Sequence, residues 1–170
     1  MSQLLALSLS IGILGAIWAY LALDLLSSLL LVWAGFIAWG CYFHTGANGN
    51  ALTKTIVGNA YGAIIGWIAL LVINNVHVGL PGAVWPAIVV GVTVFFLVIV
   101  ASISALSVVP ANVYGYAAIV AYALSAGASA DSLTSATAAN PLIKVIASMI
   151  LGALFGLASN KLSAVLAKKV

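Results

Sequence analysis

The chain has 170 residues, of which 65% are hydrophobic and only 4% are charged, and its net charge is +3. Soluble domains contain about 25% charged residues, so this composition excludes a soluble globular protein and indicates a protein embedded in a lipid bilayer. The sequence has no paired carboxylates, no Ser/His/Asp set, no nucleotide-binding glycine loop and no histidine pair at metal-ligand spacing. We therefore expect no enzymatic activity, no cofactor, no metal site and no nucleic-acid partner.

Turn signals and charged residues divide the chain into six apolar segments. A helix of about 20 residues crosses a bilayer core of about 30 Å. The predicted spans are residues 4–23, 26–43, 55–73, 84–103, 114–126 and 142–162, and the start of the fifth is open to an earlier position. The first segment lacks a basic leader and is longer than the apolar part of a signal peptide, so we interpret it as a retained span.

The few charges predict the orientation of the spans. Six spans put both termini on one side. That side carries Lys54, Lys161, Lys168 and Lys169. Asp24 and Asp131 lie on the other side, and Lys144, near the outer end of the last span, can snorkel to the interface. Because lysine favours the cytoplasmic side, both termini are predicted to be cytoplasmic.

The stretch SISALSVVPANVYGY, residues 102–116, is irregular. No charge separates the fourth and fifth spans there, and Pro110 lacks a backbone donor and disfavours helix just before it. Irregular backbone at membrane depth is tolerated only inside protein or beside water. Two interpretations remain open, a tight turn at the inner surface and a broken helix that reaches into the membrane.

An internal repeat relates residues 1–78 to residues 79–170. Small residues recur every four positions in the third and sixth spans, as Gly58, Gly62 and Gly66 and as Ser148, Gly152 and Gly156. The second and fifth spans also correspond, since Gly35 and Tyr42 are echoed by Gly115 and Tyr122. Each half holds an odd number of spans, so the halves must be inverted, as in many transporters with a solute site at the repeat interface. We expect an all-α membrane protein with six transmembrane helices in a 3+3 inverted repeat.

The two ladders of small residues let helix backbones approach closely. Their most direct role is helix packing, either within the chain or between the subunits of a homo-oligomer.

The densest aromatic block is WAGFIAWGCYFHTG, residues 33–46. On a helix one face holds Trp33, Ile37, Gly40 and His44, and the opposite face holds Gly35, Trp39, Tyr42 and Gly46. Glycines beside aromatics on both faces predict that protein covers both. An interfacial aromatic belt is one interpretation and suits Tyr42 and Phe43. The other is an aromatic slot that replaces the hydration of a small planar solute.

Polar residues near this block complete a candidate pathway. The candidate pore or substrate-binding residues are Trp33, Phe36, Trp39, Tyr42, His44, Asn59, Asn112, Tyr114, Tyr116 and Tyr122. The asparagines and tyrosines are also typical of interhelical hydrogen bonds without any solute. His44 and His77 fall at span ends on opposite sides, where each is either a pH gate or a solvated loop residue.

No Asp, Glu, Lys or Arg lies in the middle of any predicted span. Ion-coupled transporters usually keep such groups as relays, so the sequence favours passive passage of a small, polar, uncharged solute. We expect a channel or facilitator for a solute of the urea or short-amide kind. The alternatives are a non-transporting structural or regulatory membrane protein, whose motifs only form interfaces, and a substrate carrier without ion coupling.

Three motifs carry a family resemblance: WAGFIAWGCYF, SVVPANVYGYAAIVAY and a closing LG-x-x-FG pattern at Leu151–Gly152 and Phe155–Gly156. Together they resemble a family of small bacterial inner-membrane proteins known as DUF1097, a domain of unknown function. The resemblance covers most of the chain and implies a location in the bacterial cytoplasmic membrane. It supplies no substrate and no functional residues.

Overall fold

The computed structural model describes residues 1–167, and the regular secondary structure in this range is entirely helical. Its α-helices are α1 (Gln3–Tyr20), α2 (Val32–His44), α3 (Gly49–Asn75), α4 (Val84–Ile99), α5 (Val109–Ser125), α6 (Ala130–Thr134) and α7 (Pro141–Leu166). A π-helical turn, Leu21–Leu25, extends α1, and two 3-10 turns, Val100–Ser102 and Ser104–Leu106, follow α4. The all-α prediction is confirmed.

The prediction of six spans is supported only in part. Within residues 1–167, four helices are long and apolar enough to cross a membrane, namely α1 with its π-helical turn, α3, α4 with its first 3-10 turn, and α7. The 13 residues of α2 and the 17 of α5 extend only about 20 Å and 26 Å. Both are shorter than the hydrocarbon core of a bilayer. The short helix α6 was not predicted.

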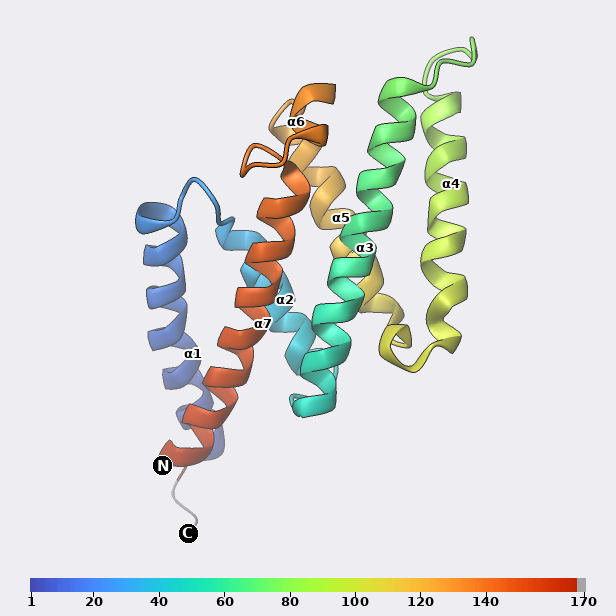
Figure 1. The fold of residues 1–170 in the computed structure, drawn as a ribbon. Coiled ribbons are helices and arrows are strands. Elements are labelled where there is room, and N and C mark those ends of the chain that lie inside the picture. Colours follow the sequence, from blue (N-terminus) through green and yellow to red (C-terminus); the bar gives the residue numbers. More distant parts are fainter. Residues whose placement is uncertain (168–170) are drawn as a thin grey trace.

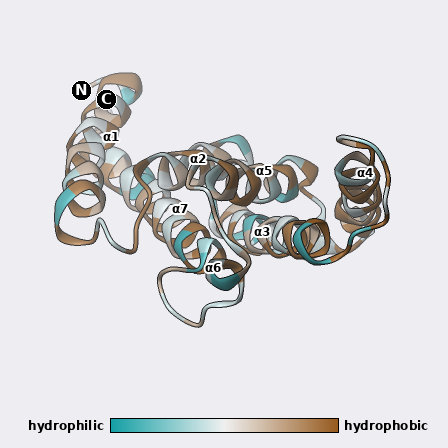
Figure 2. Cartoon of the chain, turned by 90° about the horizontal axis from the view of Figure 1, so that it is seen from above, coloured by the Kyte–Doolittle hydropathy of each residue, from teal (hydrophilic) through white to brown (hydrophobic). Residues whose placement is uncertain are grey.

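The helices alternate in direction, and α1 begins at the end of the bundle where α7 finishes (Figure 1). Seen from above, α2, α3, α5 and α7 form the centre, while α1 and α4 lie at opposite edges (Figure 2). The edge helix α1 packs on α7, and the edge helix α4 packs on α3. Apolar side chains cover the outer faces of α1 and α4, as expected of helices that contact lipid.

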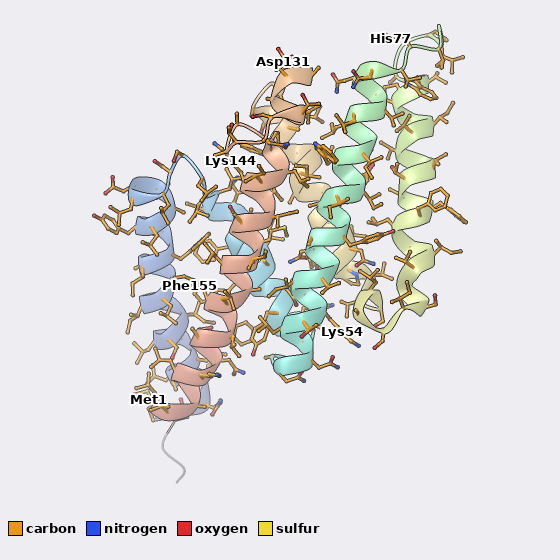
Figure 3. The ribbon with its side chains drawn as sticks, in the orientation of Figure 1. Met1, Lys54, His77, Asp131, Lys144 and Phe155 are labelled. Carbon is orange, nitrogen blue, oxygen red and sulfur yellow. The ribbon has the colours of Figure 1, made fainter. Side chains whose placement is uncertain are left out.

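The charges lie at the two ends of the bundle. Lys54 lies at the same end as Met1, whereas Asp131, Lys144 and His77 lie at the other end (Figure 3). Lys168 and Lys169 of the predicted positive tail lie outside the described residues.

Close backbone contact holds the central helices in two pairs, α3 with α5 and α2 with α7. A Cβ atom added to Gly62 of α3 would overlap the backbone carbonyl oxygen of Asn112 in α5, and one added to Gly152 of α7 would overlap that of Gly35 in α2. Gly115 of α5 lies equally close to the carbonyl oxygen of Asn59. At these positions only glycine fits, because the neighbouring backbone occupies the place of a side chain.

The connection before α5 is a compact pair of 3-10 turns, and α5 itself is continuous from Val109 to Ser125. Pro110 lies in its first turn, where the missing N–H is not needed. The Asn112 carboxamide donates to the carbonyl oxygens of Leu97 and Leu106, at 3.3 and 3.1 Å. These bonds satisfy backbone groups that the irregular connection leaves without helical partners. The structure thus shows a turn that joins α4 to α5, and the depth of this turn in the membrane stays a prediction.

The corresponding segment before α2 is secured in the same way. The Leu31 N–H donates to the Ser148 hydroxyl at 2.8 Å, and the Trp18 indole N–H donates to the Val32 carbonyl oxygen at 2.9 Å. Side chains from α7 and α1 thus satisfy the backbone at the start of α2.

We expect Gly62→Ala to lower the free energy of unfolding by about 1–3 kcal/mol or more, because the added methyl group overpacks the contact with α5. The matched control is Gly91→Ala in α4, where no atom lies within 4 Å of an added Cβ. Alanine favours helix there, so stability should be unchanged or higher by up to about 1 kcal/mol. Thermal unfolding in detergent micelles measures both, and equal effects of the two substitutions would contradict the packing role.

Candidate functional site

The structure distributes the ten candidate residues over three regions rather than one slot. Trp39 and Tyr42 lie between α2 and α7, whereas Asn112 and Tyr116 are buried where α5 meets α3 and α4. The third region is the seam between α2 and α5, which is lined or flanked by Trp33, Phe36, Tyr114 and Tyr122. The two remaining candidates are His44, exposed at one end of the bundle, and Asn59, inside it.

Between α2 and α7 the aromatic side chains are anchored by hydrogen bonds. The Trp39 indole N–H donates to the Ser159 hydroxyl at 3.1 Å. The Asn160 carboxamide donates to the Tyr42 hydroxyl at 3.3 Å and to the Ala47 carbonyl oxygen at 2.7 Å. Trp39 is 3% exposed and Tyr42 is completely buried, which excludes an interfacial belt for these two residues. They close the bundle at the end where α2 turns into α3.

Only one face of α2 is covered by protein in the single chain. Gly35, Trp39 and Tyr42 are buried, but Trp33, Ile37, Gly40 and His44 of the opposite face are exposed. The prediction that both faces are covered is therefore wrong for one subunit. Glycine and aromatic content did not distinguish an outward groove from an internal contact.

The exposed seam between α2 and α5 contains a cavity of about 350 Å³. Its lining is Phe36, Ile37, Gly40, Cys41, Tyr114 and Ala117. Above it the rings of Trp33 and Tyr122 are 6.5 Å apart, and the Lys144 ammonium lies 6.0 Å from the centre of the Tyr122 ring. Small residues thus form the floor of this groove, aromatic rings form its walls, and no charged side chain lines it.

Behind the groove lies a short column of polar groups. Cys41, at the floor, is beside Thr55 of α3, and Asn59 follows Thr55 by one helical turn on the same face. Thr55 and Asn59 are 0% and 1% exposed. Among the described residues, neither polar atom of the Asn59 carboxamide has a hydrogen-bond partner, and the Thr55 hydroxyl has none except the weakly hydrogen-bonding Cys41 thiol beside it.

Sequence reasoning identified Asn59 but missed Thr55. The available signal was their spacing of four residues on a helix whose small residues mark its packed face. In Asn112 the amide nitrogen donates to two carbonyl groups, and only its Oδ1 lacks a hydrogen-bond partner among the described residues. The Tyr116 hydroxyl is likewise bonded, to Thr93 at 3.0 Å.

Neither histidine contacts this region. His44 is the last residue of α2 and His77 follows the end of α3, so the two exposed histidines lie near opposite ends of α3. Across residues 1–167 no three His, Cys, Asp or Glu side chains come together as a metal site would require.

A model of the family described as "Protein of unknown function (DUF1097)" matches residues 8–164. The chain belongs to this family. No curated protein and no solved structure matches it.

We expect Asn160→Leu to lower the free energy of unfolding by about 1–3 kcal/mol, because it leaves the Ala47 carbonyl oxygen without its partner. Tyr42→Phe removes only the longer of the two Asn160 contacts and should have a smaller effect. Thermal unfolding in detergent measures both. A larger effect of Tyr42→Phe would show that the tyrosine hydroxyl, not the turn carbonyl, anchors this end of α7.

Proposed function

We propose that this protein is a passive facilitator for a small, polar, uncharged solute of the urea or short-amide kind. In this proposal six membrane segments form a 3+3 inverted repeat, and the pathway follows the seam between α2 of the first half and α5 of the second. The observation that carries it is the groove at this seam, which has aromatic walls, a small-residue floor, no charge and a polar column behind it.

The burial of the chain supports the repeat. Residues 51–69 of α3 and residues 141–159 of α7 follow the same succession of buried, half-buried and exposed positions, residue by residue, at the offset of ninety. Helices with unrelated neighbours have no reason to share such a pattern, because burial depends on what packs on each face.

Helix contacts support it as well. If α1, α2 and α3 correspond to α4, α5 and α7, then the pair α2–α7 corresponds to α5–α3, and the pair α1–α7 corresponds to α4–α3. Both sets of contacts are present. Each half therefore packs its middle helix on the last helix of the other half, as two interlocked units related by a twofold axis would.

Individual contacts also repeat. Gly66 faces Ile119, and the corresponding Gly156 faces Trp39.

Corresponding residues are eighty positions apart in α2 and α5 but ninety apart in α3 and α7, and this difference has a structural cause. Four residues, 45–48, connect α2 to α3, whereas residues 126–140 connect α5 to α7 and contain α6. Leu133 of α6 is completely buried, and its carbonyl oxygen accepts from the Trp67 indole N–H at 2.8 Å and the Asn140 amide at 3.0 Å. The insertion caps one end of the bundle and makes the two ends different.

No charged side chain lines the groove, which favours an uncharged solute, because ionic solutes and ion coupling usually require ionisable groups within the membrane. The lysine at position 54 and the start of α1 lie at one end, so we place both termini on the cytoplasmic side of a bacterial inner membrane. The groove is open on its outer side, which favours a homo-oligomer in which further copies surround it.

The proposal is tested by filling the groove. Ala117→Trp places a large ring in the cavity, and we expect urea and formamide flux to fall to that of liposomes without protein. Val92→Trp on the exposed face of α4 is the matched control and should leave flux unchanged. Stopped-flow measurements on proteoliposomes report the rates.

Two outcomes would contradict the proposal. Wild-type permeability equal to that of empty liposomes for urea, formamide, glycerol and water favours the non-transporting alternative, in which the motifs serve only packing. Full flux through a correctly assembled Ala117→Trp variant moves the pathway away from this seam.

A further inference from the structure

We propose that Thr55 and Asn59 form a binding position for the amide group of the solute, at which the solute supplies the hydrogen bonds that the protein leaves unmade. This inference rests on the proposed function and narrows its solute to molecules that carry a hydrogen-bond donor and an acceptor side by side.

The first observation is that the two side chains depart from the behaviour of their own residue types in this structure. Asn74 and Asn75, on the same helix, each donate to the carbonyl oxygen four residues earlier, at 2.8 Å. Thr93 does the same through its hydroxyl, at 2.8 Å. Serine, threonine and asparagine in helices commonly satisfy themselves in this way. Thr55 and Asn59 make no such bond to their own helix, although both are buried.

The second observation comes from the other half of the repeat. At the offset of ninety, Thr55 corresponds to Val145 and Asn59 to Met149. Val145 and Met149 are 0% and 2% exposed, as deeply buried as their counterparts. The fold therefore accepts apolar side chains at these positions, and packing alone gives no reason for a hydroxyl and a carboxamide in α3.

An unpaired polar group inside a bundle is costly. Leaving a buried donor or acceptor unsatisfied destabilises a protein by about 1–3 kcal/mol, and most buried polar groups in native proteins have a partner. The Asn59 carboxamide has two unpaired atoms, and the Thr55 hydroxyl has only the weak Cys41 thiol beside it. A transient partner with matching groups would offset this cost, while an apolar molecule would not.

The chemistry of the three atoms defines the partner. A carboxamide offers a donor N–H and an acceptor oxygen side by side, and a hydroxyl offers one of each. Urea or a short primary amide presents the complementary pair in one plane. An alcohol engages only one atom of the carboxamide at a time, and an ion meets no opposite charge and would be desolvated without compensation.

We infer that the solute reaches this position past Cys41. The Cys41 thiol is a weak hydrogen-bonding group that lines the groove at the α2–α5 seam and lies beside Thr55. Thr55 and Asn59 are themselves buried, so the solute has to displace side chains between the groove and the pair.

The experiment replaces the pair by the residues of the other half, as Thr55→Val and Asn59→Met. Urea and acetamide flux into proteoliposomes should fall tenfold or more, equivalent to 1.4 kcal/mol, while glycerol flux falls less. Saturation-transfer NMR of acetamide with protein in micelles should give a signal for the wild type that is lost in Asn59→Met. The thermal unfolding temperature should stay equal or rise, because an unpaired amide is removed.

Asn74→Met is the matched control, since it makes the same change on the same helix at an asparagine that is exposed. It should preserve flux and the acetamide signal. Asn59→Leu is a second apolar variant, and failure of both Asn59 variants to fold would identify a structural amide and overturn the inference.

The inference and the proposed function fail separately. An unchanged ratio of urea to glycerol flux, together with an unchanged acetamide signal in Asn59→Met, overturns the binding position but leaves a facilitator. A wild-type protein that passes no solute, but gives an acetamide signal dependent on Asn59, overturns the facilitator and keeps the binding position.

Discussion

The structure depends on backbone-to-backbone contact between α3 and α5 and between α2 and α7. In a bilayer, lipid tails are as apolar as leucine, so helices associate through close van der Waals contact rather than through exclusion of water. Glycine makes that contact possible where a Cβ would overlap the next helix, as at Gly62 and Gly152. Since each contact joins a helix of residues 1–78 to one of residues 79–170, both parts of the chain contribute to one core.

This pairing also explains why α2 and α5 can be short. A helix that does not span a bilayer exposes irregular backbone at its end, which must be satisfied by protein. The Ser148 hydroxyl accepts the Leu31 N–H from the very face of α7 on which α2 packs. Asn112 performs the equivalent task for the connection before α5. The same helix faces that pair the helices therefore also supply the hydrogen bonds to the free backbone groups.

Periodicity in the sequence predicted which helix faces are packed, but the sequence did not predict features that depend on distant packing partners. Small residues at every fourth position marked the packed faces of α3 and α7, but not that α5 and α2 would cover them. The sequence did not reveal that α2 begins only at Val32, because the leucines that precede Val32 are as apolar as the helix itself. Leu133 lies in a polar stretch of the sequence, so its burial was not predicted. Its backbone is held by Trp67, which is distant in the sequence, and by Asn140, which looks like an ordinary loop residue. Thr55 was not predicted as a site residue because a helical threonine usually bonds its own backbone, and only the structure shows that this one does not.

The difference between the two halves locates function more sharply than their similarity. Where α3 and α7 follow the same burial, their common features, the small residues above all, are explained by packing. Their differences are not. Thr55 and Asn59 differ from Val145 and Met149 at buried positions, where leaving a polar group without a partner costs stability. In the proposed facilitator, this difference gives a solute one preferred position beside α3, on the side of the groove at the α2–α5 seam.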